Sequence, residues 1–269
     1  MQKIILFINF IILGFFGVSQ TVPMDEIRHK TDSILREGNL LYRLEKAAWI
    51  STDQAMEVPS VRNSFGGFLT YLRQDTVVAI IYDRMDFTKV IFELLFTDPA
   101  NEPVAKRLSK RTVTEYEKEL ILARDNIING IIDNEYDVRE PEGFSLNFVI
   151  LPFEQGYKLY ILTGTSQHNI IPFGNDYIFF ANAEGEITRW RKFHSRLIPQ
   201  STVGPGGEPI TTMMHSHLRS EPYISATDIC TFMLYGGYYG LNEFGVYSPA
   251  LGVSFTYFLD QNKVEINPF

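Results

Sequence analysis

The sequence predicts an α+β protein in which a mixed, largely antiparallel sheet is flanked by helices. Three observations favour this class. One long stretch of the first half has helical periodicity, several stretches around it have strand patterns, and short polar turns join some of these strands in the manner of hairpins. Because strands joined by a hairpin are antiparallel, we expect most of the sheet to be antiparallel.

The N-terminus has the pattern of a secretory signal peptide over residues 1–19. Lys3 precedes an apolar run, and the small residues Gly17 and Ser19 suit a cleavage site. The alternative is an uncleaved membrane anchor, for which the run is short and contains Asn9. We therefore expect a secreted or periplasmic protein with no membrane span in the mature chain. The absence of a cysteine near the cleavage site also leaves no attachment point for a lipoprotein anchor.

Composition narrows the class of partner and the source of stability. The net charge of −8 argues against a protein that binds nucleic acid through its overall field. The only cysteine is Cys230, so an internal disulfide is excluded and the stability must come from a hydrophobic core. A metal role for Cys230 is conceivable, but a small buried side chain on a helix is the favoured interpretation.

The region 20–140 is expected to be α+β. The pattern predicts a helix over 24–37 that Gly38 ends, a short helix near 40–48, and strands over 68–72, 77–82 and 89–96. The clearest helical pattern covers 112–129, with Thr112 and Glu115 as a capping box and Gly130 at the end. The acidic, turn-rich segment 133–143 follows and is the candidate boundary, although both regions can also form one continuous domain.

The region 141–269 is expected to be richer in strands. The pattern predicts two hairpins, over 146–151 with 157–162 and over 176–181 with 187–193. Residues 211–214 lead into a strand that contains His215 and His217, and a helix begins after Thr227. Closing strands are expected over 245–247, 253–259 and 263–266. The glycine-rich loop 204–209 lacks the spacing of a phosphate-binding loop, so it is interpreted as a connection.

The most specific pattern in the chain combines two histidines with a helix start. His215 and His217 are one residue apart, so on a strand their side chains share a face. Ser225 and Asp228 follow after a short loop and begin the predicted helix. The strand end and the helix start can therefore bring two imidazoles and one carboxylate to one point. Three nitrogen or oxygen ligands with an open fourth position make up a catalytic zinc site.

Simpler interpretations exist for parts of this pattern. Ser225 and Asp228 also match a capping box, which satisfies the free amides of a helix start without any metal. The metal interpretation therefore rests on the paired histidines. His194 can approach the same point from a neighbouring strand, but its position at a strand end favours a surface residue.

The run His-Ser-His, seven residues, Ser, two residues and Asp resembles the signature of the JAMM zinc metalloproteases, also called the MPN-plus or JAB family. The resemblance covers about fourteen residues directly. It implies that His215, His217 and Asp228 bind Zn²⁺ and that Ser225 assists catalysis. The family usually has proline after the second histidine, whereas this chain has Leu218.

The resemblance also implies an upstream glutamate that acts as acid and base. Spacing favours Glu154 for this role, whereas order along the chain favours Glu142 because it follows the long helix more directly. Both can also be solvated turn residues, and the compact pattern that opens the glutamate strand in the family is missing.

The resemblance leads to the expected function, an exported zinc-dependent hydrolase of amide or isopeptide bonds in a peptide or protein substrate. A bound metal lowers the pKa of water, a nearby carboxylate takes up the proton, and a hydroxyl such as that of Ser225 can stabilise the oxyanion. The alternative is a non-catalytic secreted binding module that keeps a JAMM-like scaffold, with or without metal.

Overall fold

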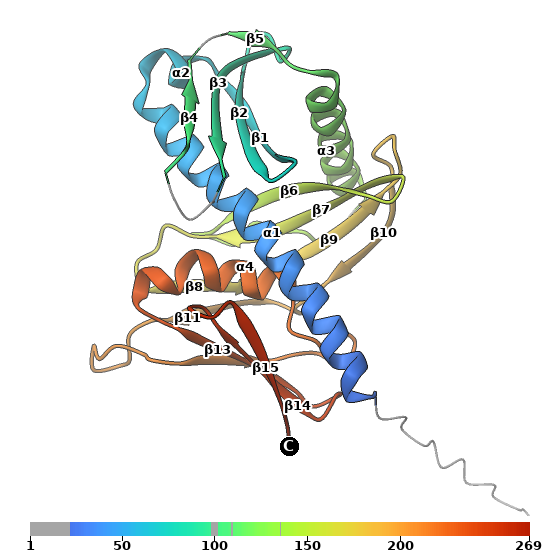
Figure 1. Ribbon diagram of the computed structural model, residues 1–269, viewed down its shortest axis with the longest axis vertical. Coiled ribbons are helices and arrows are strands. Elements are labelled where there is room, and N and C mark those ends of the chain that lie inside the picture. The colour runs from blue at the N-terminus through green and yellow to red at the C-terminus, as the bar shows by residue number, and fades with distance from the viewer. Residues whose placement is uncertain (1–21, 98–101, 109, 135) are drawn as a thin grey trace, which may run out of the picture.

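The computed structural model describes residues 22–97, 102–108, 110–134 and 136–269. It confirms the predicted α+β class, because helices pack against several largely antiparallel sheets (Figure 1). The predicted signal peptide lies outside the described residues. Within the described ranges, none of the helices combines the length and the apolar character that a membrane crossing requires.

The longest helix, α1 (Met24–Glu57), runs along most of the molecule (Figure 1). The prediction of two helices separated by Gly38 is wrong, because Gly38 lies inside α1 and is buried. A Cβ atom at Gly38 would lie only 2.8 Å from Cβ of Ile229 in α4. The glycine therefore permits the close crossing of two helices instead of ending one.

The first sheet has the strand order β1-β2-β3-β4, with β5 also paired to β3. Its elements follow the short helix α2 (Pro59–Ser64) and are β1 (Phe65–Arg73), β2 (Thr76–Asp83), β3 (Lys89–Phe96), β4 (Ala105–Arg107) and β5 (Arg111–Thr112). The three predicted strands of this region are confirmed. Strand β2 is buried on both faces: Ile81 belongs to a core cluster with α1, and Ile80 belongs to a second one with α3.

Helix α3 (Glu115–Asp133) covers the face of this sheet opposite α1 (Figure 1). Its capping box is formed by Thr114 and Glu117, so the prediction of Thr112 and Glu115 is off by two residues. Thr112 instead belongs to β5, where it pairs with Lys89. Gly130 lies inside the helix rather than at its end.

The second sheet has the strand order β10-β9-β7-β6 and is antiparallel throughout. Its strands are β6 (Ser145–Phe153), β7 (Gly156–Gly164), β9 (Tyr177–Ala181) and β10 (Ile187–Lys192), which confirms both predicted hairpins. Strands β8 (Ile170–Gly174) and β11 (Leu197–Ser201) were not predicted, and they pair with each other.

The third sheet has the order β12-β13-β14-β15, in which only β12 and β13 are parallel. Its elements are β12 (Met213–Ser216), β13 (Glu243–Ser248), β14 (Val253–Phe258) and β15 (Lys263–Pro268), and α4 (Ala226–Tyr235) with the 3-10 turn η1 (Gly237–Tyr239) lies between β12 and β13. One hydrophobic cluster joins Leu44 of α1, Ile81 of β2, Val149 of β6, Phe232 of α4 and Phe244 of β13. Residues on both sides of the predicted boundary at 133–143 therefore share a core.

Candidate metal centre

The motif strand places both predicted histidines on its inner face. Burial alternates along β12, so that Met213 and His215 are buried while Met214 and Ser216 are exposed. His217 continues this alternation just after the strand, and its backbone amide donates to the carbonyl of Tyr247 at 3.0 Å. The shared face expected from the spacing is thus present.

The start of α4 forms the capping box that the sequence predicts. The Ser225 hydroxyl accepts from the Asp228 amide at 2.9 Å, and Oδ2 of Asp228 accepts from the Ser225 amide at 2.9 Å. The same carboxylate faces the imidazoles, since its Oδ1 lies 3.3 Å from Nε2 of His215. The cap and the ligand interpretation are therefore compatible, because Oδ1 of Asp228 takes no part in the cap and faces the imidazoles.

A third histidine joins this group from the second sheet. His194 follows β10, and it is buried rather than a surface residue, so the sequence interpretation was wrong on this point. The cause is the register of the β9–β10 hairpin. Lys192 pairs with Tyr177, and the Phe193 amide donates to the carbonyl of Asp176 at 3.1 Å, which sets His194 beside the start of β9.

The four side chains point their donor atoms at one place. The Nε2 atoms of His194, His215 and His217 are 3.0–3.1 Å from one another. Oδ1 of Asp228 is 3.4 Å from Nε2 of His194, and Oδ2 is 3.0 Å from Nε2 of His217. Nitrogen ligands about 2.0–2.1 Å from a zinc ion at the centre of a tetrahedron are roughly 3.3–3.4 Å apart. The observed separations are close to this value.

All four residues are buried, with exposed fractions of 2% for His194, 9% for His215, 6% for His217 and 1% for Asp228. The three imidazoles hold the pKa of Asp228 well below its usual range, although burial alone would raise it. Burial lowers the pKa of His215. Three imidazole nitrogens with lone pairs directed at one point need a cation between them, and a metal ion or a proton can supply it.

The histidines differ in the partners of their other ring nitrogen. Nδ1 of His194 lies 2.7 Å from Oδ1 of Asp176, and Nδ1 of His217 lies 3.1 Å from the carbonyl oxygen of Glu221. Nδ1 of His215 is buried without a hydrogen-bond partner. With Nε2 directed at the common point, Nδ1 carries the proton and donates to Asp176 and to Glu221.

Burial by itself would lower the pKa of His194. The nearby carboxylates of Asp176 and Asp228 outweigh this effect and raise the pKa to about 9. His194 therefore holds a proton at neutral pH when no metal is bound. A metal ion that binds at this point must displace that proton.

The proposed acid/base glutamate is not part of this group. Glu154 is exposed in the turn between β6 and β7. That turn precedes Tyr157, which pairs with Ala181 at the far end of β9 from Asp176. The four residue steps from Tyr177 to Ala181 span roughly 13 Å of strand. Glu142 is also exposed, in a turn before β6. The structure thus brings together His215, His217, Asp228 and Ser225, and neither glutamate is among the clustered donor residues.

The surroundings of two further side chains, Cys230 and Ser225, indicate structural roles. Cys230 is fully buried in the hydrophobic core, which confirms its interpretation as a small apolar side chain. Burial also raises the pKa of its thiol well above the usual range, so it stays protonated. The Ser225 hydroxyl lies 2.8 Å from that of Thr227, which donates to Oδ2 of Asp176. The start of α4 is therefore linked to His194 through Asp176.

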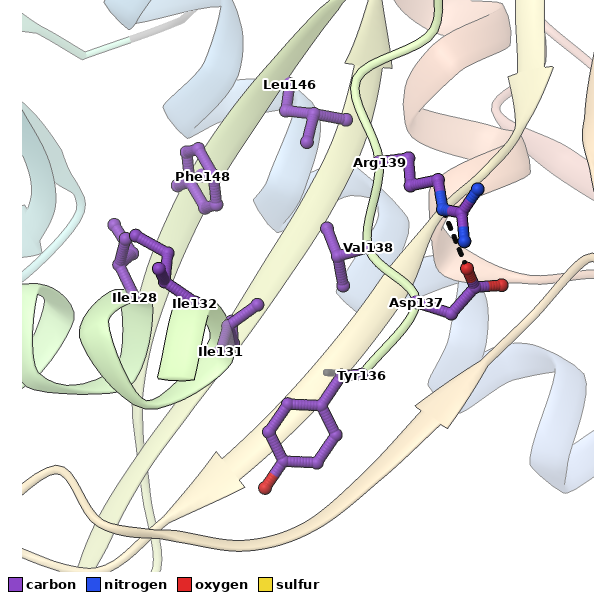
Figure 2. A pocket seen from close by; sticks show the side chains of 9 residues that line it. All are labelled: Ile128, Ile131, Ile132, Tyr136, Asp137, Val138, Arg139, Leu146 and Phe148. Atoms are coloured by element: carbon purple, nitrogen blue, oxygen red, sulfur yellow. Dashed lines mark ion pairs between the residues drawn. The ribbon is translucent and has the colours of Figure 1, made fainter. Parts of the chain in front are cut away.

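A separate surface pocket of ≈ 660 Å³ lies between the end of α3, the segment 136–139 and β6 (Figure 2). Its walls are mainly apolar, from residues such as Ile128, Leu146 and Phe148. The charged side chains at its side, Asp137 and Arg139, form an ion pair at 3.0 Å with each other. This pocket contains none of the four clustered residues and brings no set of reactive groups together.

No protein-family model matches the chain, and comparisons with curated protein sequences and with solved structures give no significant match.

Proposed function

We propose that this protein binds a transition metal ion, with Zn²⁺ as the first candidate, through His194, His215, His217 and Asp228. The observation that carries the proposal is the convergence of four buried donor atoms from three separate parts of the chain. Buried polar groups that face one another in this way are costly unless a ligand or a proton compensates them.

The chemistry of the donor atoms favours a borderline divalent ion. Imidazole nitrogen and carboxylate oxygen suit zinc and its neighbours in the transition series, whereas calcium and magnesium prefer oxygen ligands alone. The described residues contain no thiolate at this point, since Cys230 lies in the core. Monovalent copper, which selects sulfur ligands, is therefore a poor candidate.

A metal titration of the mature chain tests this proposal. After removal of metal with a chelator, Zn²⁺ is added and its stoichiometry is measured by mass spectrometry, with a chromogenic chelator as competitor for affinity. We expect one ion per chain, and its loss in His215→Ala and in His217→Ala. His168→Ala and His29→Ala are matched controls because both histidines are exposed. Equal metal content in all four variants would sink the proposal.

Hydrolysis of amide or isopeptide bonds is the second proposal, and one observation favours it. The residues that the JAMM resemblance assigns as ligands lie around one point, with Ser225 at the adjoining helix start. A bound zinc ion would supply a lowered pKa for water and polarise a carbonyl group. Because His194 offers a fourth donor, the reaction requires an additional coordination position or release of His194.

A peptidase assay separates this second proposal from the first. The zinc-loaded protein is incubated with a library of peptides and with an isopeptide-linked substrate, and products are identified by mass spectrometry. Cleavage that disappears in Asp228→Asn supports the hydrolase. Metal binding without cleavage of any substrate in the library supports the non-catalytic binding module instead.

A further inference from the structure

We propose that Asp176 and Thr227, which do not themselves bind the metal ion, support the ligand His194. The carboxylate of Asp176 holds His194 in the orientation of a ligand and balances the charge of a divalent ion, and Thr227 holds Asp176. The inference rests on the proposed metal binding. It adds a second carboxylate to the site and ties the histidine from the second sheet to the helix start.

The first step of the argument is the geometry around Asp176, whose carboxylate is held at both oxygens. Oδ1 accepts from Nδ1 of His194 at 2.7 Å, and Oδ2 accepts from the Thr227 hydroxyl. Asp176 and Thr227 are both buried, with exposed fractions of 3% and 2%. Asp176 is thereby held as a hydrogen-bond acceptor for His194 and not as a ligand. This hydrogen bond selects the tautomer whose Nε2 lone pair faces the other histidines.

The second step is a comparison among the three histidines. His217 donates to a backbone carbonyl, and Nδ1 of His215 has no partner. His194 alone among them donates to a carboxylate. A carboxylate acceptor raises the basicity of the imidazole and strengthens its bond to a metal. His194 therefore receives the strongest support, although it lies farthest along the chain from the helix that carries Asp228.

The third step is charge. A divalent ion held by three neutral imidazoles and one carboxylate keeps one uncompensated positive charge, which is costly in a buried site. Asp176 supplies the second negative charge one ligand away from the ion. The other nearby acid, Glu221, is partly exposed and lies 3.4 Å from Arg191. The combination of Asp228 and Asp176 thus makes the site neutral when it holds a divalent ion.

Asp176→Asn tests the role of charge with little change of shape, because an amide oxygen can still accept from His194. We expect Zn²⁺ affinity to fall by roughly 10- to 100-fold, the effect usual for outer-shell residues. Asp83→Asn is the matched control, since Asp83 is a buried carboxylate in the first sheet. Affinity is measured by chelator competition, and the visible spectrum of the Co²⁺-loaded protein reports the ligand geometry.

Thr227→Val provides an independent variant, because it removes the hydroxyl that holds Asp176 without removing any charge. We expect a smaller loss of affinity than for Asp176→Asn and an altered Co²⁺ spectrum. Unchanged affinity and spectrum in both variants would overturn the inference while leaving the proposed metal binding intact. If Asp176→Asn does not fold, the Thr227→Val result alone decides. Absence of metal from the unaltered protein would instead refute the proposed function itself.

Discussion

Asp228 combines two roles that usually belong to different side chains. Oδ2 accepts from the Ser225 amide at the start of α4 and lies 3.0 Å from Nε2 of His217. Oδ1 faces the imidazoles of His194 and His215. The second oxygen, Oδ1, has no hydrogen-bond partner among the described residues. A helix cap alone would leave this buried oxygen without a hydrogen-bond donor, whereas a bound metal ion would satisfy it.

Ser225→Ala separates the cap from the ligand set. Loss of the Ser225 hydroxyl removes the acceptor for the Asp228 amide and should reduce the free energy of unfolding by about 1 kcal/mol. The metal stoichiometry should remain that of the unaltered protein, because the carboxylate stays in place. Urea unfolding and metal analysis measure the two effects. A variant that loses stability and metal together would show that the cap and the site are one unit.

The raised pKa of His194, to about 9, predicts how metal affinity depends on pH. Below this value the metal-free protein holds a proton on His194, so metal must compete with it. Zn²⁺ affinity should therefore weaken as pH falls, by up to roughly tenfold per pH unit for one displaced proton. Chelator competition between about pH 6 and pH 8.5 measures this slope. Affinity that is independent of pH in this range would contradict a protonated His194.

The same raised pKa predicts that the metal-free protein becomes less stable as pH rises, whereas metal affinity increases as pH rises. A group whose pKa rises on folding stabilises the folded state fully below its unfolded pKa and loses this contribution as pH rises through the folded value. The unfolding free energy of the metal-free protein should thus decline between about pH 6.5 and pH 9. Replacement of His194 by glutamine should remove this decline, which denaturant titrations at several pH values can measure.

Four residues of the site could be predicted from the sequence, whereas His194 and Asp176 could not. His215, His217, Ser225 and Asp228 are close in sequence, so local strand and helix rules bring them together. His194 and Asp176 depend on the register of a hairpin in a different sheet. The turn at Glu184 and Gly185 predicts this hairpin and its strand pairing. The position of the hairpin beside β12 depends on tertiary packing, for which the sequence has no local pattern.

At the scale of elements, the crossing of α1 with α4 depends on one glycine. In Gly38→Ala the new Cβ would lie 2.8 Å from Ile229 Cβ and 3.1 Å from the Ala226 carbonyl. Overpacking of this kind typically costs about 1–3 kcal/mol, more than the roughly 1 kcal/mol that alanine gains over glycine in a helix. We expect a net loss of stability in urea unfolding.

Gly130→Ala in α3 is the matched control for that substitution. Its Cβ would meet only the end of the Ile187 side chain, at 3.3 Å, which can move aside. The variant should be neutral or more stable by up to about 1 kcal/mol. Equal destabilisation by both alanines would show that helix crossing is not the reason for Gly38.

These two glycines also explain where the prediction of elements failed. A glycine after a helical pattern usually indicates a helix end, and both Gly38 and Gly130 were assigned that role. Each instead lies within its helix. Strand 89–96 was predicted with its observed ends, because a dense run of apolar residues bounded by polar turns is a local signal. Close packing between helices far apart in sequence is not local.

At the scale of the whole molecule, the metal point joins parts that are distant in the chain. His194 follows a strand of the second sheet, His215 lies in the third with His217 just after its strand, and Asp228 lies in α4. A bound ion would therefore cross-link two sheets and a helix around the shared core. Such an ion should stabilise the fold because the unfolded chain does not hold these donors together.

Thermal unfolding measures this coupling. With free Zn²⁺ at about one hundred times its dissociation constant, the free energy of unfolding should rise by about 2.7 kcal/mol. The melting temperature of the unaltered protein and of His168→Ala should increase with zinc concentration, and that of His215→Ala should not. A similar increase in all three proteins would indicate metal binding outside the four residues.

X-ray absorption at the zinc edge of the zinc-loaded protein tests the central claim most directly, because it reports the atoms bound to the ion. Three imidazole nitrogens and one carboxylate oxygen as protein ligands, at about 2.0–2.2 Å from the metal, are the predicted result. The imidazole signal should diminish by one ligand in His194→Ala. A first shell of oxygen atoms alone, or a spectrum unchanged in that variant, would contradict the assignment of His194, His215, His217 and Asp228 as the metal centre.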